Sequence, residues 1–197
     1  MLNQKMELSK LNQNIFDHLY LDIIEFRKTF DLPVSKPLTL DEKSDKLHNS
    51  LAIEELTELA QAENKIEQAD AIIDIVYVLV GRLVHLGQSK IKDNLTINYL
   101  IDLLLSVSIN LGIQFLPCWN EVHLSNMSKA CRNKKEYLDT KAFYKKQGIK
   151  LIGIPKDNYI IAKCSEDFIK NNQIILKNKI IKSIYYHPAN LASIIQK

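Results

Sequence analysis

Apolar residues recur at helical spacing over the first three quarters of the chain. Residues 15–30 have the pattern of an amphipathic helix, and Pro33 and Pro37 mark the loop that follows. Asp41 is placed to cap a second helix. Further helices are predicted over residues 65–86, 95–112 and 118–130, the first ending at Gly87 and the last starting after Pro117. These segments predict a mainly α fold, a helical bundle.

The last quarter of the chain has a different pattern. The stretches LIGI, NYIIAKC, QIILK and KIIKSIYY are short runs rich in β-branched and aromatic residues, which are typical of strands in a small antiparallel sheet or hairpins. A short C-terminal helix is expected after Pro188. The sequence therefore predicts a helical domain over residues 1–147 and a small α+β extension over 148–197 that packs on it.

Composition indicates a globular protein: 46% of the 197 residues are hydrophobic and 25% are charged. The formal charge of +3 is too small to predict a nucleic-acid partner, although the C-terminal third is richer in lysine. Three cysteines without metal-ligand spacing, Cys118, Cys131 and Cys164, favour neither disulfides nor a zinc site. Together with an N-terminus that lacks an apolar signal sequence, they predict a cytoplasmic location.

Residues 100–116 approach the length of a membrane span. The segment contains Asp102, Asn110 and Gln114, and Pro117 follows it directly. Such polar interruptions favour a helix buried in a core or a subunit contact, so no membrane partner is expected.

Six carboxylates stand on two consecutive predicted helices. At about 100° per residue, Glu54, Glu55 and Glu58 fall within an arc of about 100° on the first helix. Glu67, Asp70 and Asp74 fall within about 60° on the second, which is otherwise apolar nearly all round. Part of this acidic face must therefore point into the bundle, where it needs a positive partner.

A hard divalent cation is the simplest partner for clustered carboxylate oxygens. Mg²⁺ binds oxygen ligands, keeps some of its waters and is usually completed by substrate phosphates. A run such as EELTE alone is most often a solvated helix face. The second cluster, in apolar surroundings directly after the first, favours a metal site that holds a phosphorylated ligand.

The same residues resemble a known family. EExxE at residues 54–58 followed by ExxD at residues 67–70 resembles the motif pair of the all-α nucleotide pyrophosphohydrolases, the superfamily of MazG-type proteins, dimeric dUTPases and phosphoribosyl-ATP pyrophosphohydrolases. DAIIDIVYVLVG and EVHLSNMSK are most similar to the phosphoribosyl-ATP pyrophosphohydrolase-like branch. The resemblance runs from Phe16 to about Gly148. The ending IIKSIYYHPANL is also similar to that branch but implies no chemical role.

The resemblance implies an Mg²⁺-dependent hydrolase, with Mn²⁺ as a substitute, that cleaves a nucleoside triphosphate between the α- and β-phosphates in nucleotide-pool housekeeping. Glu54 and Glu55 are expected to be catalytic, with one glutamate activating water. The expected metal ligands are Glu55, Glu58, Glu67, Asp70 and Asp74. Asn126 and Lys129 are candidates for substrate contacts because their spacing places them on one helical side with Val122.

Several alternatives stay open from the sequence alone. A non-catalytic nucleotide sensor or a helical interaction module would have the same bundle. A ferritin-like iron site needs Glu-x-x-His pairs, which the sequence lacks, and a P-loop enzyme needs a glycine-rich phosphate loop. The apolar helices and the family both favour a homodimer or homotetramer. The preferred base and the glutamate that activates water are not determined.

Overall fold

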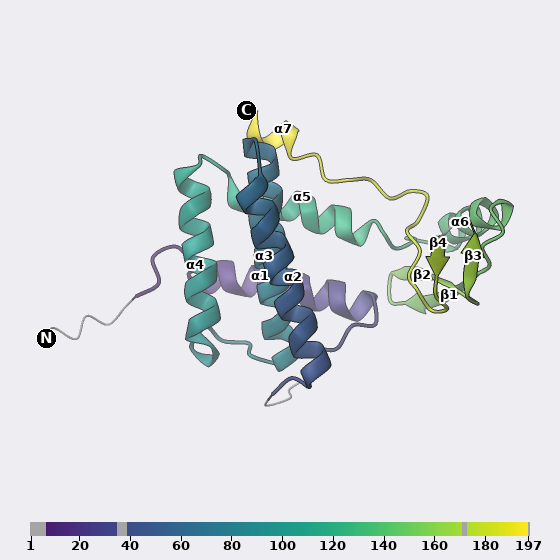
Figure 1. The fold of residues 1–197 in the computed structure, drawn as a ribbon, viewed down its shortest axis with the longest axis horizontal. Helices are drawn as coiled ribbons and strands as arrows, with labels where there is room; N and C mark the ends of the chain where they lie inside the picture. Colours follow the sequence, from purple (N-terminus) through teal and green to yellow (C-terminus); the bar gives the residue numbers. More distant parts are fainter. Residues whose placement is uncertain (1–6, 35–38, 171–172, 197) are drawn as a thin grey trace, which may run out of the picture. The chain divides into compact units, whose positions relative to one another are not determined.

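The computed structural model describes residues 7–34, 39–170 and 173–196. The chain divides into two compact units, which we describe separately. Unit 1 comprises Met1–Arg27, Pro33–Val122 and Asn190–Lys197, and unit 2 comprises Lys28–Leu32 and His123–Ala189. The described residues form seven α-helices and two two-stranded hairpins, so the predicted mainly α fold with a small β component is confirmed (Figure 1).

Unit 1 is built around a helical hairpin. Helix α2 (Glu42–Gln61) and helix α3 (Lys65–Leu86) lie side by side (Figure 1) and are joined by a three-residue turn. The other elements are α1 (Gln13–Thr29), the 3₁₀ turn η1 (Ile91–Asp93), α4 (Leu95–Asn110), α5 (Phe115–Met127) and α7 (Ala192–Ile195); α1 and α5 each end in unit 2. Helix α3 supplies the largest share of the core of any helix, because its apolar residues are buried almost all round.

The ends of these helices follow from the capping residues in the sequence. Asp41 caps α2 by accepting a hydrogen bond from the Ser44 backbone N–H at 2.9 Å, as predicted. Gly87 ends α3 in a left-handed conformation with φ of 69°, also as predicted. Pro37 lies outside the described residues.

Two predicted boundaries were wrong. Helix α4 ends at Asn110, because the chain turns at residues 111–112 and Gly112 adopts a positive φ of 68°. Helix α5 begins at Phe115 rather than after Pro117. Proline is tolerated there because backbone N–H groups in the first helical turn have no partner inside the helix.

Helix α4 contains residues 100–110, the first part of the segment that approached the length of a membrane span. No single helix among the described residues is long and apolar enough to cross a membrane; α4 and α5 reach that length only together, and they are bent by 111°. Asp102 of α4 is buried and accepts hydrogen bonds from the backbone N–H groups of Ser9, Lys10 and Leu11 at 2.6 to 3.1 Å. This carboxylate therefore fixes the residues that lead into α1.

Unit 2 combines one helix with two hairpins. Strands β1 (Leu151–Lys156) and β2 (Tyr159–Cys164) pair antiparallel, with Leu151 opposite Cys164, and β3 (Phe168–Lys170) pairs with β4 (Gln173–Ile175). Helix α6 (Lys134–Lys146) precedes them. Their shared core consists of Ile149, Leu151, Ala162, Cys164, Ile175 and Ile181, with Tyr137, Tyr144 and Phe168 packed against it.

The strand predictions for the C-terminal region were right in three of four places. LIGI, NYIIAKC and QIILK coincide with β1, β2 and β4. KIIKSIYY is not a strand, since only Ile180 forms a bridge, to Lys163, and the backbone then turns at residues 184–185. The short helix after Pro188 is α7, which contacts α3 within unit 1. The predicted domain boundary at residue 147 stays a prediction, because compactness does not show which parts fold independently.

Candidate functional site

The α2–α3 hairpin brings the two acidic clusters to the same end of unit 1. Its turn is fixed by Asn64, whose side-chain oxygen accepts hydrogen bonds from the backbone N–H groups of Ile66 and Glu67, each at 3.0 Å. Glu67 in turn accepts a hydrogen bond from the Glu63 backbone N–H at 2.7 Å. This reciprocal capping places the carboxylates of α3 beside those of α2.

A cavity of about 220 Å³ opens at this end of the hairpin. Its lining includes Glu58 and Gln61 from α2, Ala62 from the turn, and Glu67 and Asp70 from α3. Three carboxylates from two helices therefore share one small space. Sequence reasoning missed Gln61, at the end of α2, and Ala62, the first residue of the turn.

The electrostatics of the site reflect this crowding. Burial, followed by the negative charges of Glu58, Glu54 and Asp70, raises the pKa of Glu55 to about 7. Loss of surrounding water and the charge of Glu58 raise the pKa of Asp70 as well. The carboxylates of α2 and α3 thus repel one another, as expected of an acidic site that a cation or a proton would stabilise.

The donor set fits a hydrated divalent cation better than a closed metal cage. All the candidate donors are carboxylate oxygens, which Mg²⁺ prefers. Among the described residues, no three His, Cys, Asp or Glu side chains converge closely enough to hold a metal ion by themselves. Mg²⁺ commonly uses one or two carboxylates together with waters and substrate phosphates, and the open cavity leaves room for both.

The remaining predicted site residues are less central to this cavity. Glu54 is exposed on α2, Glu55 is half-buried, and Asp74 is half-buried one turn beyond Asp70 on α3. Asn126 and Lys129 belong to unit 2, where Lys129 Nζ donates a hydrogen bond to Asn126 Oδ1 at 2.6 Å. Since α5 ends at Met127, Lys129 lies in the turn after the helix, and the expected single helical side with Val122 is wrong for this residue.

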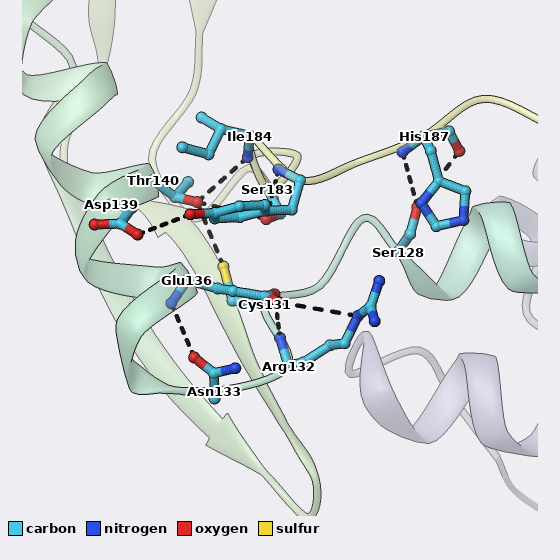
Figure 2. A network of polar contacts seen from close by, with 11 residues as sticks. Ser128, Cys131, Arg132, Asn133, Glu136, Asp139, Thr140, Ser183, Ile184 and His187 are labelled. Atoms are coloured by element: carbon cyan, nitrogen blue, oxygen red, sulfur yellow. Dashed lines mark hydrogen bonds and ion pairs between the residues drawn. The ribbon is translucent and has the colours of Figure 1, made fainter.

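The segment IIKSIYYHPANL, residues 180–191, had no assigned role in the sequence analysis. Within unit 2, hydrogen bonds connect it to SNMSK, residues 125–129. Figure 2 shows the His187 backbone beside Ser128, whose hydroxyl accepts a hydrogen bond from the His187 N–H at 3.2 Å. Ser125 Oγ donates to the His187 carbonyl at 2.9 Å, and the Ser183 N–H donates to the Lys129 carbonyl at 2.9 Å. The hydroxyls of Ser125 and Ser128 therefore hold the backbone of His187 in place, a role that the sequence pattern did not indicate.

The opposite end of the α2–α3 hairpin carries buried basic groups. His48 Nε2 lies 3.2 Å from His85 Nδ1, and both imidazoles are buried. Burial and the charge of Arg27, together with smaller effects of His85 and Arg82, lower the pKa of His48 to about 4; Asp45 acts in the opposite direction. Arg27 is itself buried, which lowers its pKa to about 10. This end of unit 1 therefore favours a neutral imidazole pair.

Residues 23–93 match the family model described as phosphoribosyl-ATP pyrophosphohydrolase. No curated protein and no solved structure matches the chain. The matched segment covers a little over a third of the sequence and contains α2, α3 and all six carboxylates, whereas Asn126 and Lys129 lie outside it. This match relates residues 23–93 to the phosphoribosyl-ATP pyrophosphohydrolase family, which belongs to the MazG-like all-α nucleoside triphosphate pyrophosphohydrolase superfamily.

Proposed function

We propose that this protein is an Mg²⁺-dependent nucleoside triphosphate pyrophosphohydrolase that acts in nucleotide-pool housekeeping. The family of residues 23–93 indicates a pyrophosphohydrolase acting on a nucleotide. The observation that carries the finer proposal is the cavity at the α2–α3 turn, into which both helices direct carboxylates. Such a cavity suits a polyphosphate bound through a divalent cation.

The proposed reaction is hydrolysis of the bond between the α- and β-phosphates. The oxygen of a water molecule forms a new bond to the α-phosphorus while the bond from that phosphorus to the bridging oxygen breaks. The bridging oxygen leaves with pyrophosphate, and a nucleoside monophosphate remains. This displacement needs a positioned water and neutralised phosphate oxygens rather than an unusual nucleophile.

The carboxylates divide into two proposed roles. Glu54 and Glu55 are the catalytic candidates, one of which accepts the proton of the attacking water. Glu55, Glu58, Glu67, Asp70 and Asp74 are the proposed ligands of Mg²⁺ or Mn²⁺. When bound, the ion supplies positive charge to the phosphate oxygens and lowers the pKa of bound water.

Binding of the nucleotide also requires groups outside the acidic cavity. Asn126 and Lys129 are proposed to contact the substrate, since an ammonium group attracts phosphate and an amide can recognise a base or sugar. Their mutual hydrogen bond holds the two side chains together. Exchange of this bond for contacts with the nucleotide is expected when substrate binds.

The first test measures pyrophosphate release from a panel of canonical and modified nucleoside triphosphates and phosphoribosyl-ATP, with Mg²⁺, Mn²⁺ or EDTA. Wild type, Glu55→Gln and Glu58→Gln are compared with Glu63→Gln, which removes an exposed carboxylate at the same turn. We expect metal-dependent release with monophosphate as the second product. A loss in kcat/KM of about 100-fold or more is expected in the first two variants and little change in the third.

A second candidate is a non-catalytic nucleotide-binding or interaction module. If no panel member is cleaved, the proposal of an enzyme is refuted. Stabilisation by nucleotide and metal in a melting experiment would then favour a sensor, and no stabilisation would favour an interaction module.

We also propose a homodimer or homotetramer. Helix α2 exposes Ile53 by 63% and Leu56 by 50%, and α4 exposes Leu100 by 47% and Leu103 by 59%. Apolar residues repeated along helix faces are typical of subunit contacts. Light scattering coupled to gel filtration should give a dimer or tetramer mass that decreases in Ile53→Lys; a wild-type monomer at all concentrations would contradict the proposal.

A further inference from the structure

The small net charge of the chain conceals two strongly and oppositely charged units. Unit 2 contains 15 of the 26 Lys and Arg residues but only six of the 23 Asp and Glu residues. Its formal charge is therefore +9, and that of unit 1 is −6. A surplus of this size over about 70 residues creates a positive potential that attracts polyanions.

Part of this surplus is ordered along one face of α6. Lys134, Lys141 and Lys145 are all exposed and fall within about 40° around the helix axis. From Lys134 to Lys145 the helix rises by about 16 Å, which corresponds to roughly five steps of a stacked nucleic-acid strand at 3.4 Å each. The three ammonium groups therefore form a row of suitable length for several phosphates.

The row leads into a cavity of about 530 Å³ at the end of the helix. Lys141 and Lys145 line it together with Lys150, and Ile149 and Leu151 give it an apolar floor. Lys141 also lies over the Tyr137 ring at 5.8 Å. Three lysines around an apolar floor suit a ligand that has both phosphates and a flat apolar ring.

The ion pair that Lys150 forms beside this cavity is easily exchanged. Lys150 Nζ lies 3.0 Å from Glu166 Oε1, and both side chains are more than half exposed. An exposed pair of this kind contributes little to stability, because water surrounds and screens both charges. A phosphate can therefore replace Glu166 beside Lys150 at small cost.

We propose that the lysine face of unit 2, formed by Lys134, Lys141, Lys145 and Lys150, binds single-stranded nucleic acid. The lysines contact successive phosphates, and the cavity holds a base or sugar against its apolar floor. This reverses the expectation from the whole-chain charge of +3, in which the opposite charges of the two units largely cancel. A membrane surface is the less suitable partner, because Leu138 is the one large exposed apolar side chain on the side of α6 that carries the lysines.

The test is fluorescence anisotropy of labelled 20-nucleotide oligo(U) and oligo(dT) with the full chain, in EDTA, over 50 to 200 mM NaCl. The triple variant Lys141→Gln, Lys145→Gln, Lys150→Gln is compared with Lys10→Gln, Lys43→Gln, Lys92→Gln, which removes three exposed lysines from unit 1. A third protein carries Lys141→Arg, Lys145→Arg and Lys150→Arg. EDTA keeps the measurement independent of the metal-dependent reaction.

We expect wild type to bind with an affinity that falls with salt. The unit 2 glutamine variant should lose at least tenfold in affinity at 100 mM salt, and the slope of log affinity against log salt should become shallower by about 2, or 0.7 for each lost contact. The unit 1 variant and the arginine protein should stay within threefold of wild type. Absence of wild-type binding at 50 mM salt, equal losses in both glutamine variants, or binding only to anionic lipid vesicles would each overturn the proposal.

Discussion

Acidification should destabilise unit 1 through His48. The imidazole is only 7% exposed, and within the described part of the chain its Nδ1 atom is buried without a hydrogen-bond partner. A proton added there would bring a buried N–H without an acceptor, close to the positive charges of Arg27 from α1 and Arg82 from α3. The other groups facing it are His85, which shares its hydrogen bond, and Asp45, which favours the charged form only weakly.

The pKa of His48 sets the size and the direction of the effect. In the folded protein its pKa is about 4, below the ordinary value of about 6.5 in an unfolded chain. The unfolded chain therefore binds more protons in this window, so stability is complete above pH 6.5 and is lost as the pH falls towards 4. Linkage between these two pKa values gives a loss of about 2 kcal/mol at pH 5.

Urea unfolding at pH 7.5 and pH 5.0 measures this loss. Trp119, the one tryptophan of the chain, is buried in unit 1, so its fluorescence reports the unfolding of that unit. The pH-dependent decrease in free energy of unfolding should be about 2 kcal/mol smaller in His48→Gln than in wild type. His18→Gln, which removes an imidazole that is 45% exposed, should behave as wild type. Equal pH dependence in His48→Gln and wild type would refute the reasoning.

Three further predictions concern stability. Asp102→Ala should lower the free energy of unfolding by about 2 to 3 kcal/mol, measured by urea and Trp119 fluorescence, because three backbone N–H groups lose a charged acceptor; a change below 0.5 kcal/mol would contradict this. Gly153→Ala should destabilise unit 2 by about 1 to 3 kcal/mol in urea unfolding followed by circular dichroism, because its Cβ would lie 2.7 Å from the Tyr137 ring; Tyr137→Ala in the same chain should remove the clash. Glu55→Gln should raise the melting temperature in EDTA, because it removes a charge that Glu58, Glu54 and Asp70 repel. A lower melting temperature would show that the carboxylate of Glu55 stabilises the fold instead.

The sequence predicted the α2–α3 hairpin well because its signals are local. Asp41 and Gly87 determine helix ends through their own backbone and side-chain geometry, which needs no knowledge of the tertiary fold. The carboxylates could be placed on shared faces for the same reason, since helical periodicity alone relates their positions. The cavity itself follows from the turn at Asn64, and only the structure shows that Gln61 and Ala62 line it.

Tertiary contacts explain what the sequence did not predict. Helix α6 was missed because its face towards the core is made of tyrosines and Thr140 rather than aliphatic residues, so the apolar periodicity is weak. Segment 179–186 has the composition of a strand, yet its backbone groups pair with other partners, such as the Ser183 N–H with the Lys129 carbonyl. The two residues of this hydrogen bond are 54 positions apart in the chain, so local strand propensity cannot predict it.

The repulsion among the carboxylates of unit 1 is itself an argument for a ligand site at the α2–α3 turn. Unit 1 concentrates negative charge, and the raised pKa of Glu55 shows that its fold tolerates these carboxylates without relieving their repulsion. If these positions had only a structural role, an amide side chain could replace the carboxylate at each of them. Such a replacement removes the repulsion and keeps the size and shape of the side chain. Carboxylates that oppose the stability of the hairpin holding them are instead expected where a bound cation or substrate supplies the missing favourable interaction. That conflict between stability and ligand binding is a physical reason, independent of family resemblance, for assigning function to the α2–α3 turn.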